Sequence, residues 1–271
     1  MRGVVLAAVV MFGAVASAQA ADMPDFLRGS LTGGSATTVN WQGVYVGGQA
    51  GTGTSNMNFN GSARTVAASL LADTSLDENG AVSSLPVGGR VSTHGTGYGG
   101  FVGYNRQWDD VVVGVEFSDL YGKFGGTQTG TIGRSFTDPA GFLDNVTYQA
   151  SSSIAISDIG TFRARAGYAV DCFLPYVFGG FALGQGNIVN SAHIFGTQDR
   201  ATPAPAQHIE FDLSGSDGKF NHLIYGYTAG LGVDVMLVAG LFFRAEWQYV
   251  RITSQVDTSI NTVNAGLGYK F

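Results

Sequence analysis

The last segment of the chain, NTVNAGLGYKF (Asn261 to Phe271), alternates in polarity from residue to residue. The apolar positions are Val263, Ala265, Leu267, Tyr269 and Phe271. The positions between them are Thr262, Asn264, Gly266, Gly268 and Lys270. This period of two predicts a β-strand with one apolar face and one polar or small face. Most domains end in a few polar, poorly ordered residues, so a strand that ends on an aromatic residue is expected to pair with another strand of the chain.

The composition favours a β protein whose outer surface is not in contact with water. Of 271 residues, 45% are hydrophobic and 13% are charged, and the chain contains 41 Gly, 18 Phe and 11 Tyr. The charged share is about half of the usual quarter, whereas disordered chains are rich in charge and poor in aromatic residues. The net charge of −6 argues against a nucleic-acid partner. The single cysteine, Cys172, cannot form an internal disulfide and is expected to be an incidental free thiol in a turn.

The N-terminus has the pattern of an export signal. Arg2 precedes an apolar run from Val4 to Val15, and Ala18-Gln19-Ala20 forms a small-x-small cleavage site. The apolar run is shorter than the roughly 20 residues of a membrane-spanning helix. The sequence therefore predicts a signal peptide over residues 1–20, followed by a flexible periplasmic lead segment over residues 21–40.

Eight runs, the C-terminal one included, have the character of strands. They are residues 41–54, 93–108, 111–124, 152–170, 174–187, 221–237, 241–254 and 261–271. Their connections alternate between hairpin-sized links and long polar loops, and the long loops are 55–92, 125–151 and 188–220. Short turns on one side and long loops on the other are typical of an outer-membrane barrel, and an even number of strands places both ends at the periplasmic side. The pattern leaves open whether 55–92 or 188–220 contains an extra hairpin.

The two faces of these runs differ in polarity. In the run 241–254, Phe243, Ala245 and Trp247 alternate with Arg244 and Glu246. A tilted membrane strand needs about 9–11 residues, and each run is at least that long, whereas sandwich strands usually have about 5–6. The apolar face suits lipid and the charged face suits a polar lumen. We therefore predict one all-β domain over residues 41–271, an eight-stranded antiparallel up-and-down transmembrane β-barrel. A secreted β-sandwich is the alternative.

Three stretches resemble a known family. TFRARAGYAVDCFLPYVFGGFALG (161–184) resembles two adjacent strands of the small outer-membrane β-barrel family, the opacity-like and outer-membrane immunogenic proteins often labelled "porin family". YGYTAGLGVDVMLVAGLFFRAEWQYVRI (225–252) resembles the next hairpin, with its G-x-x-x-G-x-G-x-[DE] pattern, and WQGVYVGGQAG (41–51) resembles the first strand.

The resemblance implies a surface antigen in the outer membrane of a Gram-negative bacterium. It also implies that Leu267, Tyr269 and Phe271 form the C-terminal signal that the barrel assembly machinery recognises. The partners implied are outer-membrane lipid, lipopolysaccharide, the assembly machinery and periplasmic chaperones. The partner of the loops is not implied.

Five charged residues fall on the predicted inward face: Glu116, Arg163, Arg165, Arg244 and Glu246. The interior of an eight-stranded barrel is just wide enough for side chains to fill it, and buried charges must pair. These residues are therefore expected to form a charge network in the lumen. The predicted function is a structural one, which supports envelope integrity and presents loops for surface interaction. The alternative is a narrow porin for small solutes, in which the network is a gate, although a water-filled channel normally needs about 16 strands.

An enzyme and a haem-binding protein are weaker alternatives. A lipid-modifying hydrolase would need a Ser–His–acid group near the outer leaflet, and only His94 and His222 fall at the loop-side ends of predicted strands. His193 and His208 lie 15 residues apart in one predicted loop, without a neighbouring cluster of ligands at metal-binding spacing. We therefore predict neither enzymatic activity nor a cofactor.

Overall fold

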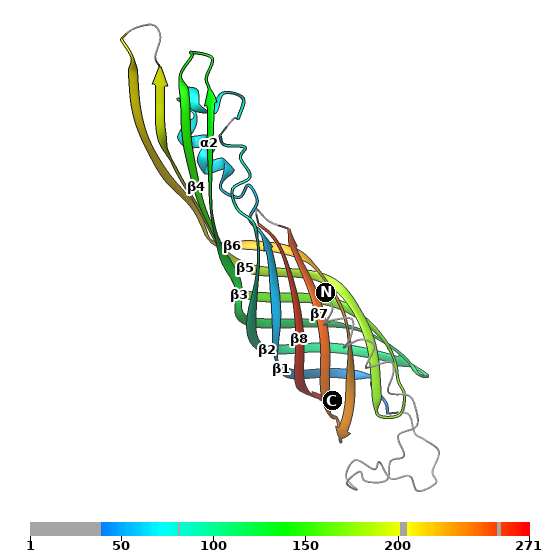
Figure 1. The fold of residues 1–271 in the computed structure, drawn as a ribbon. Coiled ribbons are helices and arrows are strands. Elements are labelled where there is room, and N and C mark those ends of the chain that lie inside the picture. Colours follow the sequence, from blue (N-terminus) through cyan, green and yellow to red (C-terminus); the bar gives the residue numbers. More distant parts are fainter. Residues whose placement is uncertain (1–38, 81, 201–204, 254–255) are drawn as a thin grey trace, which may run out of the picture. The chain divides into compact units, whose positions relative to one another are not determined.

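The structure, a computed structural model, describes residues 39–80, 82–200, 205–253 and 256–271 (Figure 1). The predicted signal peptide and the lead segment through residue 38 lie outside the described residues. Eight antiparallel strands form a closed barrel, so the predicted fold class is confirmed. The elements are β1 (Gly43–Asn58), α2 (Arg64–Leu71), the 3-10 helix η1 (Ser75–Gly80), β2 (Arg90–Trp108), β3 (Val111–Thr137), β4 (Leu143–Tyr168), β5 (Phe173–Arg200), β6 (Gln207–Val238), β7 (Leu241–Thr253) and β8 (Asp257–Lys270).

The last strand closes the barrel onto the first. β8 pairs with β1 from Asp257 opposite Asn58 to Lys270 opposite Tyr45. The backbone N–H of Phe271 then donates to the carbonyl of Val44 at 2.9 Å. Closure pairs the backbone polar groups of neighbouring strands, which lipid cannot satisfy, and it removes the free edges that an open sheet would have. The C-terminal strand therefore finds its partner in β1.

Four strands are longer than the sequence predicted, and the expectation that 125–151 and 188–220 are loops is wrong. β2 pairs with β3 only as far as Gly97 opposite Gly122, and β7 pairs with β6 only as far as Thr253 opposite Tyr225. Beyond these points β3, β4, β5 and β6 continue as a four-stranded sheet. We call it the extension sheet (residues 124–137, 143–156, 188–200 and 207–219). Its strands are rich in Ser, Thr, Asn and Gly. These residue types are common in turns, so the sequence pattern was interpreted as loops, although threonine favours strands.

The segment 55–92 contains helices rather than an extra hairpin. In its described residues, α2 and η1 form an insert (residues 59–89) that packs on the inner face of the extension sheet, as Figure 1 shows. Val66, Ala67 and Leu71 of α2 are buried, and Leu70 packs beside them. This helical spacing brings the apolar side chains onto one face. They share a core with residues of the sheet that include Val146, Tyr148, Ala150, Ala192 and Ile194.

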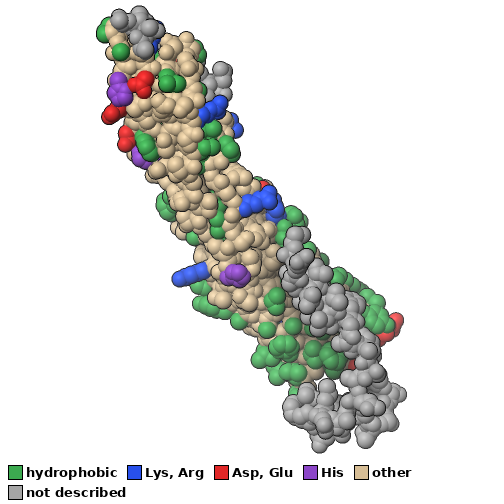
Figure 2. All heavy atoms as spheres, in the orientation of Figure 1, with side chains coloured by type: hydrophobic (Ala, Val, Ile, Leu, Met, Phe, Trp, Pro, Cys, Tyr) green, Lys and Arg blue, Asp and Glu red, His purple; other side chains and the backbone are tan. Residues whose placement is uncertain are grey.

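The barrel below the extension sheet is apolar on the outside. Exposed apolar side chains follow every strand of the barrel, among them Val115 and Phe117 on β3 and Val177 and Phe181 on β5. On the face shown in Figure 2, hydrophobic side chains gather over the barrel. Tyr98 and Tyr121 meet with ring centroids 5.7 Å apart near the end of the β2–β3 pairing. Apolar bands flanked by aromatic girdles are typical of outer-membrane barrels. Among the described residues, no helix has the length and hydropathy to cross a membrane.

Candidate functional site

The structure brings the five predicted lumen charges together. Glu116 lies on β3, Arg163 and Arg165 on β4, and Arg244 and Glu246 on β7. Each is at most 3% exposed. Alternation along the strands turns these side chains inward, and a register shift between Ile156 and Asp158 in β4 keeps Arg163 and Arg165 on the inner face. Glu116 stands directly opposite Arg163 in the β3–β4 pairing, a cross-strand position that favours opposite charges.

Sequence reasoning missed a sixth charge. Asp234 on β6 is 1% exposed and stands opposite Arg244. It accepts hydrogen bonds from Arg244 Nε at 2.8 Å and from Arg165 Nη2 at 2.7 Å. The signal was present, because Asp234 occupies the acidic position of the G-x-x-x-G-x-G-x-[DE] pattern. It was missed because only the apolar face of that strand was interpreted.

Glu116 is the centre of the cluster. Its carboxylate accepts hydrogen bonds from Arg163 Nε at 2.9 Å, Arg244 Nη1 at 2.9 Å and Arg165 Nη1 at 3.3 Å. Tyr45 donates its hydroxyl to the same carboxylate at 2.6 Å. Hydrogen bonds between ionised partners are stronger than neutral ones. Through these bonds Glu116 connects its own strand, β3, to β4, β7 and β1.

Glu246 completes the charge balance. It accepts from Arg163 Nη1 at 2.7 Å and from the hydroxyl of Tyr176 at 2.9 Å. Within the described barrel, three buried arginines therefore face three buried carboxylates. A buried ion pair offsets the loss of hydration only when its geometry is good and its remaining polar atoms are bonded. The cluster, called the lumen cluster below (Glu116, Arg163, Arg165, Asp234, Arg244, Glu246), meets that condition.

Each arginine of the lumen cluster also stacks on an aromatic ring. Arg163 lies 4.2 Å above the ring centroid of Phe178, Arg165 lies 3.8 Å above Tyr176, and Arg244 lies 3.9 Å above Phe101. A guanidinium over an aromatic face gains a further cation–π attraction, which is larger away from water. The rings therefore fix the planes of the guanidinium groups and exclude water from them.

Two glycines make room for the tyrosines of the cluster. A Cβ atom at Gly103 would lie 2.3 Å from the Tyr45 hydroxyl, and a Cβ at Gly232 would lie 2.6 Å from the Tyr176 hydroxyl. The rings can lie across these strands only because the glycines have no side chain. Glycine in the barrel wall therefore positions Tyr45 over Glu116 and Tyr176 over Glu246.

Apolar layers cover both ends of the lumen cluster. Toward the chain termini, Trp41, Phe101 and Phe242 pack with Tyr45, and the Trp41 and Phe242 rings meet edge to face at 6.1 Å. On the side of the extension sheet, a larger group includes Met57, Phe59, Leu120, Phe124 and Ile154, each at most 4% exposed. The lumen is thus filled by side chains from end to end of the described barrel, as expected for eight strands.

The histidines lie apart from the lumen cluster. His94 and His222 are exposed on β2 and β6. His193 and His208, predicted to lie in a loop, are on the extension strands of β5 and β6, where His193 bonds to Asp212 at 2.8 Å and His208 bonds to Asp199. The part of the chain that the structure describes holds no cluster of three or more His, Cys, Asp or Glu residues suited to a metal ion.

The residues of the predicted assembly signal face outward on and beyond β8. Leu267, Tyr269 and Phe271 are all exposed, and the rings of Tyr269 and Phe271 meet edge to face at 5.1 Å. Cys172 lies in the turn between β4 and β5, where its carbonyl accepts from the N–H of Met236 at 2.8 Å. The aromatic residues of the signal are therefore on the lipid-facing side of the closing strand.

Comparisons with known proteins find similar outer-membrane proteins. The 25 kDa outer-membrane immunogenic protein of Brucella ovis is 27% identical over 173 residues, which are 64% of this chain and 62% of that protein, slightly less than two thirds of the relative's length. The 31 kDa outer-membrane immunogenic protein of Brucella melitensis is 27% identical over 286 aligned residues, and the match covers 100% of both chains. Among solved structures, OprG from Pseudomonas aeruginosa has a TM-score of 0.34 at 13% identity and covers 85% of this chain and 96% of that chain. That likeness is too low to support a functional conclusion.

The family model of the outer membrane protein beta-barrel domain matches residues 5–271. The predicted resemblance and the predicted location are therefore confirmed: the chain belongs to the outer membrane protein β-barrel domain family and is a β-barrel protein of the outer membrane.

Proposed function

We propose that this protein is a structural barrel that is closed to solutes and presents the extension sheet and its insert outside the membrane. The observation that supports the proposal is the lumen cluster, whose six charges are paired and enclosed between apolar layers. A conducting path would require a continuous water-filled passage past the lumen cluster, and the side chains of the ion pairs in the cluster are at most 2% exposed. The barrel would support the envelope, and the extension sheet would make surface interactions.

Single-channel conductance of the mature protein in planar bilayers tests the closed lumen. The wild-type barrel should be silent. Glu116→Ala and Arg244→Ala, which remove one partner of the lumen cluster, should at most produce brief, irregular openings, since the apolar layers stay in place. Steady, ion-selective conductance in the wild-type protein that these substitutions enlarge would instead make the lumen cluster a gate and the protein a narrow porin.

The proposal includes a route into the membrane. The outward-facing Leu267, Tyr269 and Phe271 would be bound by the barrel assembly machinery after delivery by periplasmic chaperones, and the apolar belt would then contact outer-membrane lipid and lipopolysaccharide. Phe271→Ala should reduce the amount of folded protein in the outer membrane, while the same purified variant should still refold in detergent. If the variant reaches the wild-type level of folded protein in the outer membrane, Phe271 is not part of the assembly signal.

A further inference from the structure

The two faces of the extension sheet differ in what they offer to the outside. The inner face is covered by the insert and buries Tyr148, Ala192 and Ile194. The outer face has no such cover among the described residues and is composed mainly of Ser, Thr, Asn and Gln side chains from alternate positions of β3, β4 and β5. An uncovered face of this kind is accessible to molecules outside the cell.

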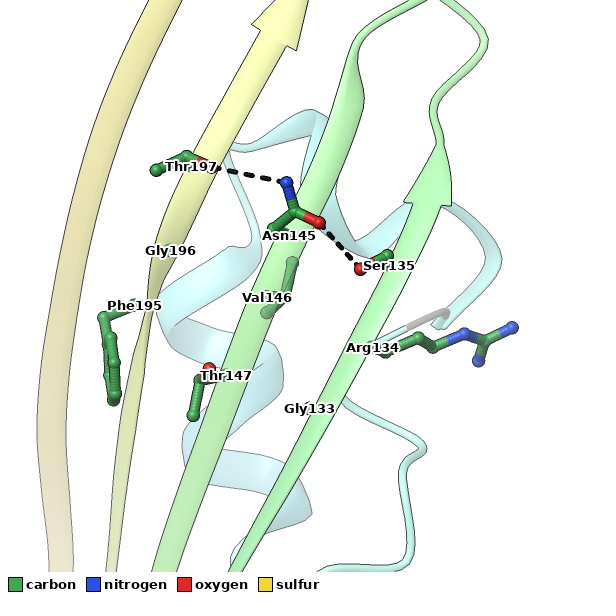
Figure 3. Close-up of a pocket in the computed structure, with 9 residues that line it drawn as sticks. All are labelled: Gly133, Arg134, Ser135, Asn145, Val146, Thr147, Phe195, Gly196 and Thr197. Atoms are coloured by element: carbon green, nitrogen blue, oxygen red, sulfur yellow. Dashed lines mark hydrogen bonds between the residues drawn. The ribbon is translucent and has the colours of Figure 1, made fainter.

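A hollow of about 350 Å³ lies in the outer face near the ends of β3, β4 and β5 (Figure 3). Figure 3 looks onto this face with the helices of the insert behind it. Gly133, Thr147 and Phe195 form one cross-strand row of its wall. Ser135, Asn145 and Thr197 form the next row toward the ends of the hairpins. The volume lies at the lower end of the range for small-molecule sites.

The hollow lies over Gly133, and packing within the protein does not require a glycine at this position. A Cβ atom built on it would meet nothing closer than the carbonyl oxygen of Val146 at 4.0 Å, and its backbone is not in the left-handed region. Glycine inside a strand weakens it, and it often marks a place where another molecule approaches closely. The neighbouring outer-face positions of β3 are Thr131 and Ser135. Gly133 therefore interrupts a row of hydroxyl side chains at the place where the hollow lies.

The hollow displays polar atoms with spare hydrogen-bonding capacity. Asn145 Oδ1 accepts a hydrogen bond from the Ser135 hydroxyl at 2.7 Å. Asn145 Nδ2 lies 3.5 Å from Thr197 Oγ1, a long distance for a hydrogen bond, so the amide N–H groups are weakly used. The Thr147 hydroxyl has no hydrogen bond within the described residues. An amide and a hydroxyl two residues apart on the outer face of one strand can both donate and accept, which suits hydroxyl groups on different carbons of a sugar ring.

Phe195 gives the hollow an aromatic wall, and the charges near it are paired. Its ring is half-buried and packs against the His193 ring, with centroids 4.8 Å apart. Arg134 extends away from Asn145 and Thr147 in Figure 3. The acidic groups of this face lie beside histidines: Asp212 and Asp199 each bond to one, and Glu210, opposite Thr197, lies 3.6 Å from His208. An anionic ligand would approach these carboxylates and be repelled, whereas a neutral one would not.

We propose that this hollow binds a neutral pyranose sugar, with the ring against Phe195 and its hydroxyl groups bonded to Asn145 and Thr147. The inference rests on the proposed function, because it names the class of partner for the exposed face. Aromatic rings and amide or hydroxyl groups together can recognise a ligand that is apolar on one side and polar at its rim. The sugar could belong to the glycan of a neighbouring lipopolysaccharide or to a glycan from outside the bacterium, which share this chemistry.

The test is calorimetric titration of the full barrel, refolded in a detergent without a sugar headgroup. The probes are neutral trisaccharides of glucose, galactose, mannose and N-acetylglucosamine, delipidated core oligosaccharide from the outer membrane, and a sulfated trisaccharide. At least one neutral probe should bind more tightly than the sulfated one. Binding to the core oligosaccharide alone would indicate a neighbouring lipid as the source, and binding to a trisaccharide would indicate an external glycan.

Two variants assign the binding to the hollow. Gly133→Thr adds a side chain that the strand can accommodate and should weaken binding at least tenfold without lowering thermal stability. Phe195→Leu keeps apolar volume but removes the ring, and it should also weaken binding at least tenfold. Thr129→Val, on the same face outside the hollow, is the control and should bind as the wild type.

Two results would overturn the sugar site: neither a neutral trisaccharide nor the core oligosaccharide binds the wild-type protein, or binding is equal in wild type, Gly133→Thr and Phe195→Leu. Conductance measured on the same preparation separates this failure from failure of the proposed function. A silent barrel that binds no sugar would retain the closed structural barrel and lose only the sugar.

Discussion

Four strands, β3 to β6, run through both the barrel and the extension sheet, yet their pattern of polarity differs between the two regions. Along β3, the inner face carries Glu116 within the barrel and Ile132 beyond it, whereas the outer face carries Phe117 within the barrel and Thr129 beyond it. Apolar groups leave water wherever they can. This exchange of faces fits the proposed arrangement, in which lipid surrounds the barrel and water surrounds the extension sheet.

The two regions also differ in what stabilises them. The lumen cluster depends on paired charges, so removal of one partner leaves another buried and uncompensated. The core between the insert and the extension sheet depends on apolar burial, so the stability that a substitution removes increases with the size of the cavity that it leaves. Substitutions in the two regions are thus expected to differ in how much stability they remove and in how far through the molecule the effect spreads.

The largest effect is expected from Arg244→Met. This substitution removes one of the two arginines that bond both Glu116 and Asp234, and it leaves three buried carboxylates facing two arginines. It should lower the free energy of unfolding by about 3–5 kcal/mol, measured by urea titration of the barrel refolded in lipid vesicles. The control is Arg106→Met, since Arg106 is exposed and lies 5.2 Å above the Trp108 ring; its loss should be about 1 kcal/mol or less. Equal losses in the two variants would show that water reaches the lumen charges.

In the extension sheet, Ile194→Ala should cost about 2–5 kcal/mol, but only locally. Ile194 is fully buried beneath the insert, and its removal should loosen residues 59–89 and speed their cleavage by a protease added outside. Heat-modified mobility of the barrel on gels should not change. Ile209→Ala is the matched control, because Ile209 is 45% exposed on the same strand pair. Joint loss of the insert and the barrel would mean that the two regions share one cooperative core.

The glycines of the barrel wall allow a sharper comparison between its two faces. Gly103→Ala places a Cβ against the Tyr45 ring and should cost about 1–3 kcal/mol through overpacking. Gly48→Ala adds the same atom on the lipid-facing side, where the nearest atom would be 3.8 Å away, and should be close to neutral. Urea titration of both variants measures the difference. A similar loss in both would mean that Tyr45 can move aside without cost.

The smallest effect is a pH dependence at the end of the β5–β6 hairpin. The Asp199 carboxylate raises the pKa of His208 by hydrogen bonding and by its charge, and His208 in turn lowers the pKa of Asp199. The His208 contribution is complete below its ordinary pKa of 6.5 and is lost as the pH rises through the raised value; the Asp199 contribution is present above its ordinary pKa of 3.8 and is lost on acidification. The pair should therefore stabilise the hairpin most between these two pH values.

Hydrogen exchange of the hairpin amides, corrected for intrinsic rates, measures this window. Wild-type protection should exceed that of His208→Gln near pH 5 and approach it at alkaline pH. Asp199→Asn should narrow the same window, which Glu210, 3.6 Å from His208, sustains in part, and the double variant should match His208→Gln. A constant difference between wild type and His208→Gln at all pH values would contradict the ion pair as its source.

The barrel could be predicted from the sequence because charged and apolar residues alternate along its strands. Glu116, Arg163 and Arg244 interrupt apolar strands, so their inward direction follows from parity alone. The extension sheet was missed because Thr127, Thr129 and Thr131 alternate with Gly and Gln, a pattern that resembles a loop. The insert was missed because α2 has no side-chain cap, and its apolar spacing is short. Distances within the lumen cluster depend on register, which one sequence does not specify.

The separation of the two cores has a consequence for how this surface can change over evolutionary time. Apart from Phe59, which packs in the barrel, the buried residues that hold the insert form a group separate from those that fill the barrel. Substitutions at independent sites have additive effects on stability, so the extension sheet and its insert can diversify while the barrel keeps its composition. The protein can thus vary this part without a loss of folding in the barrel.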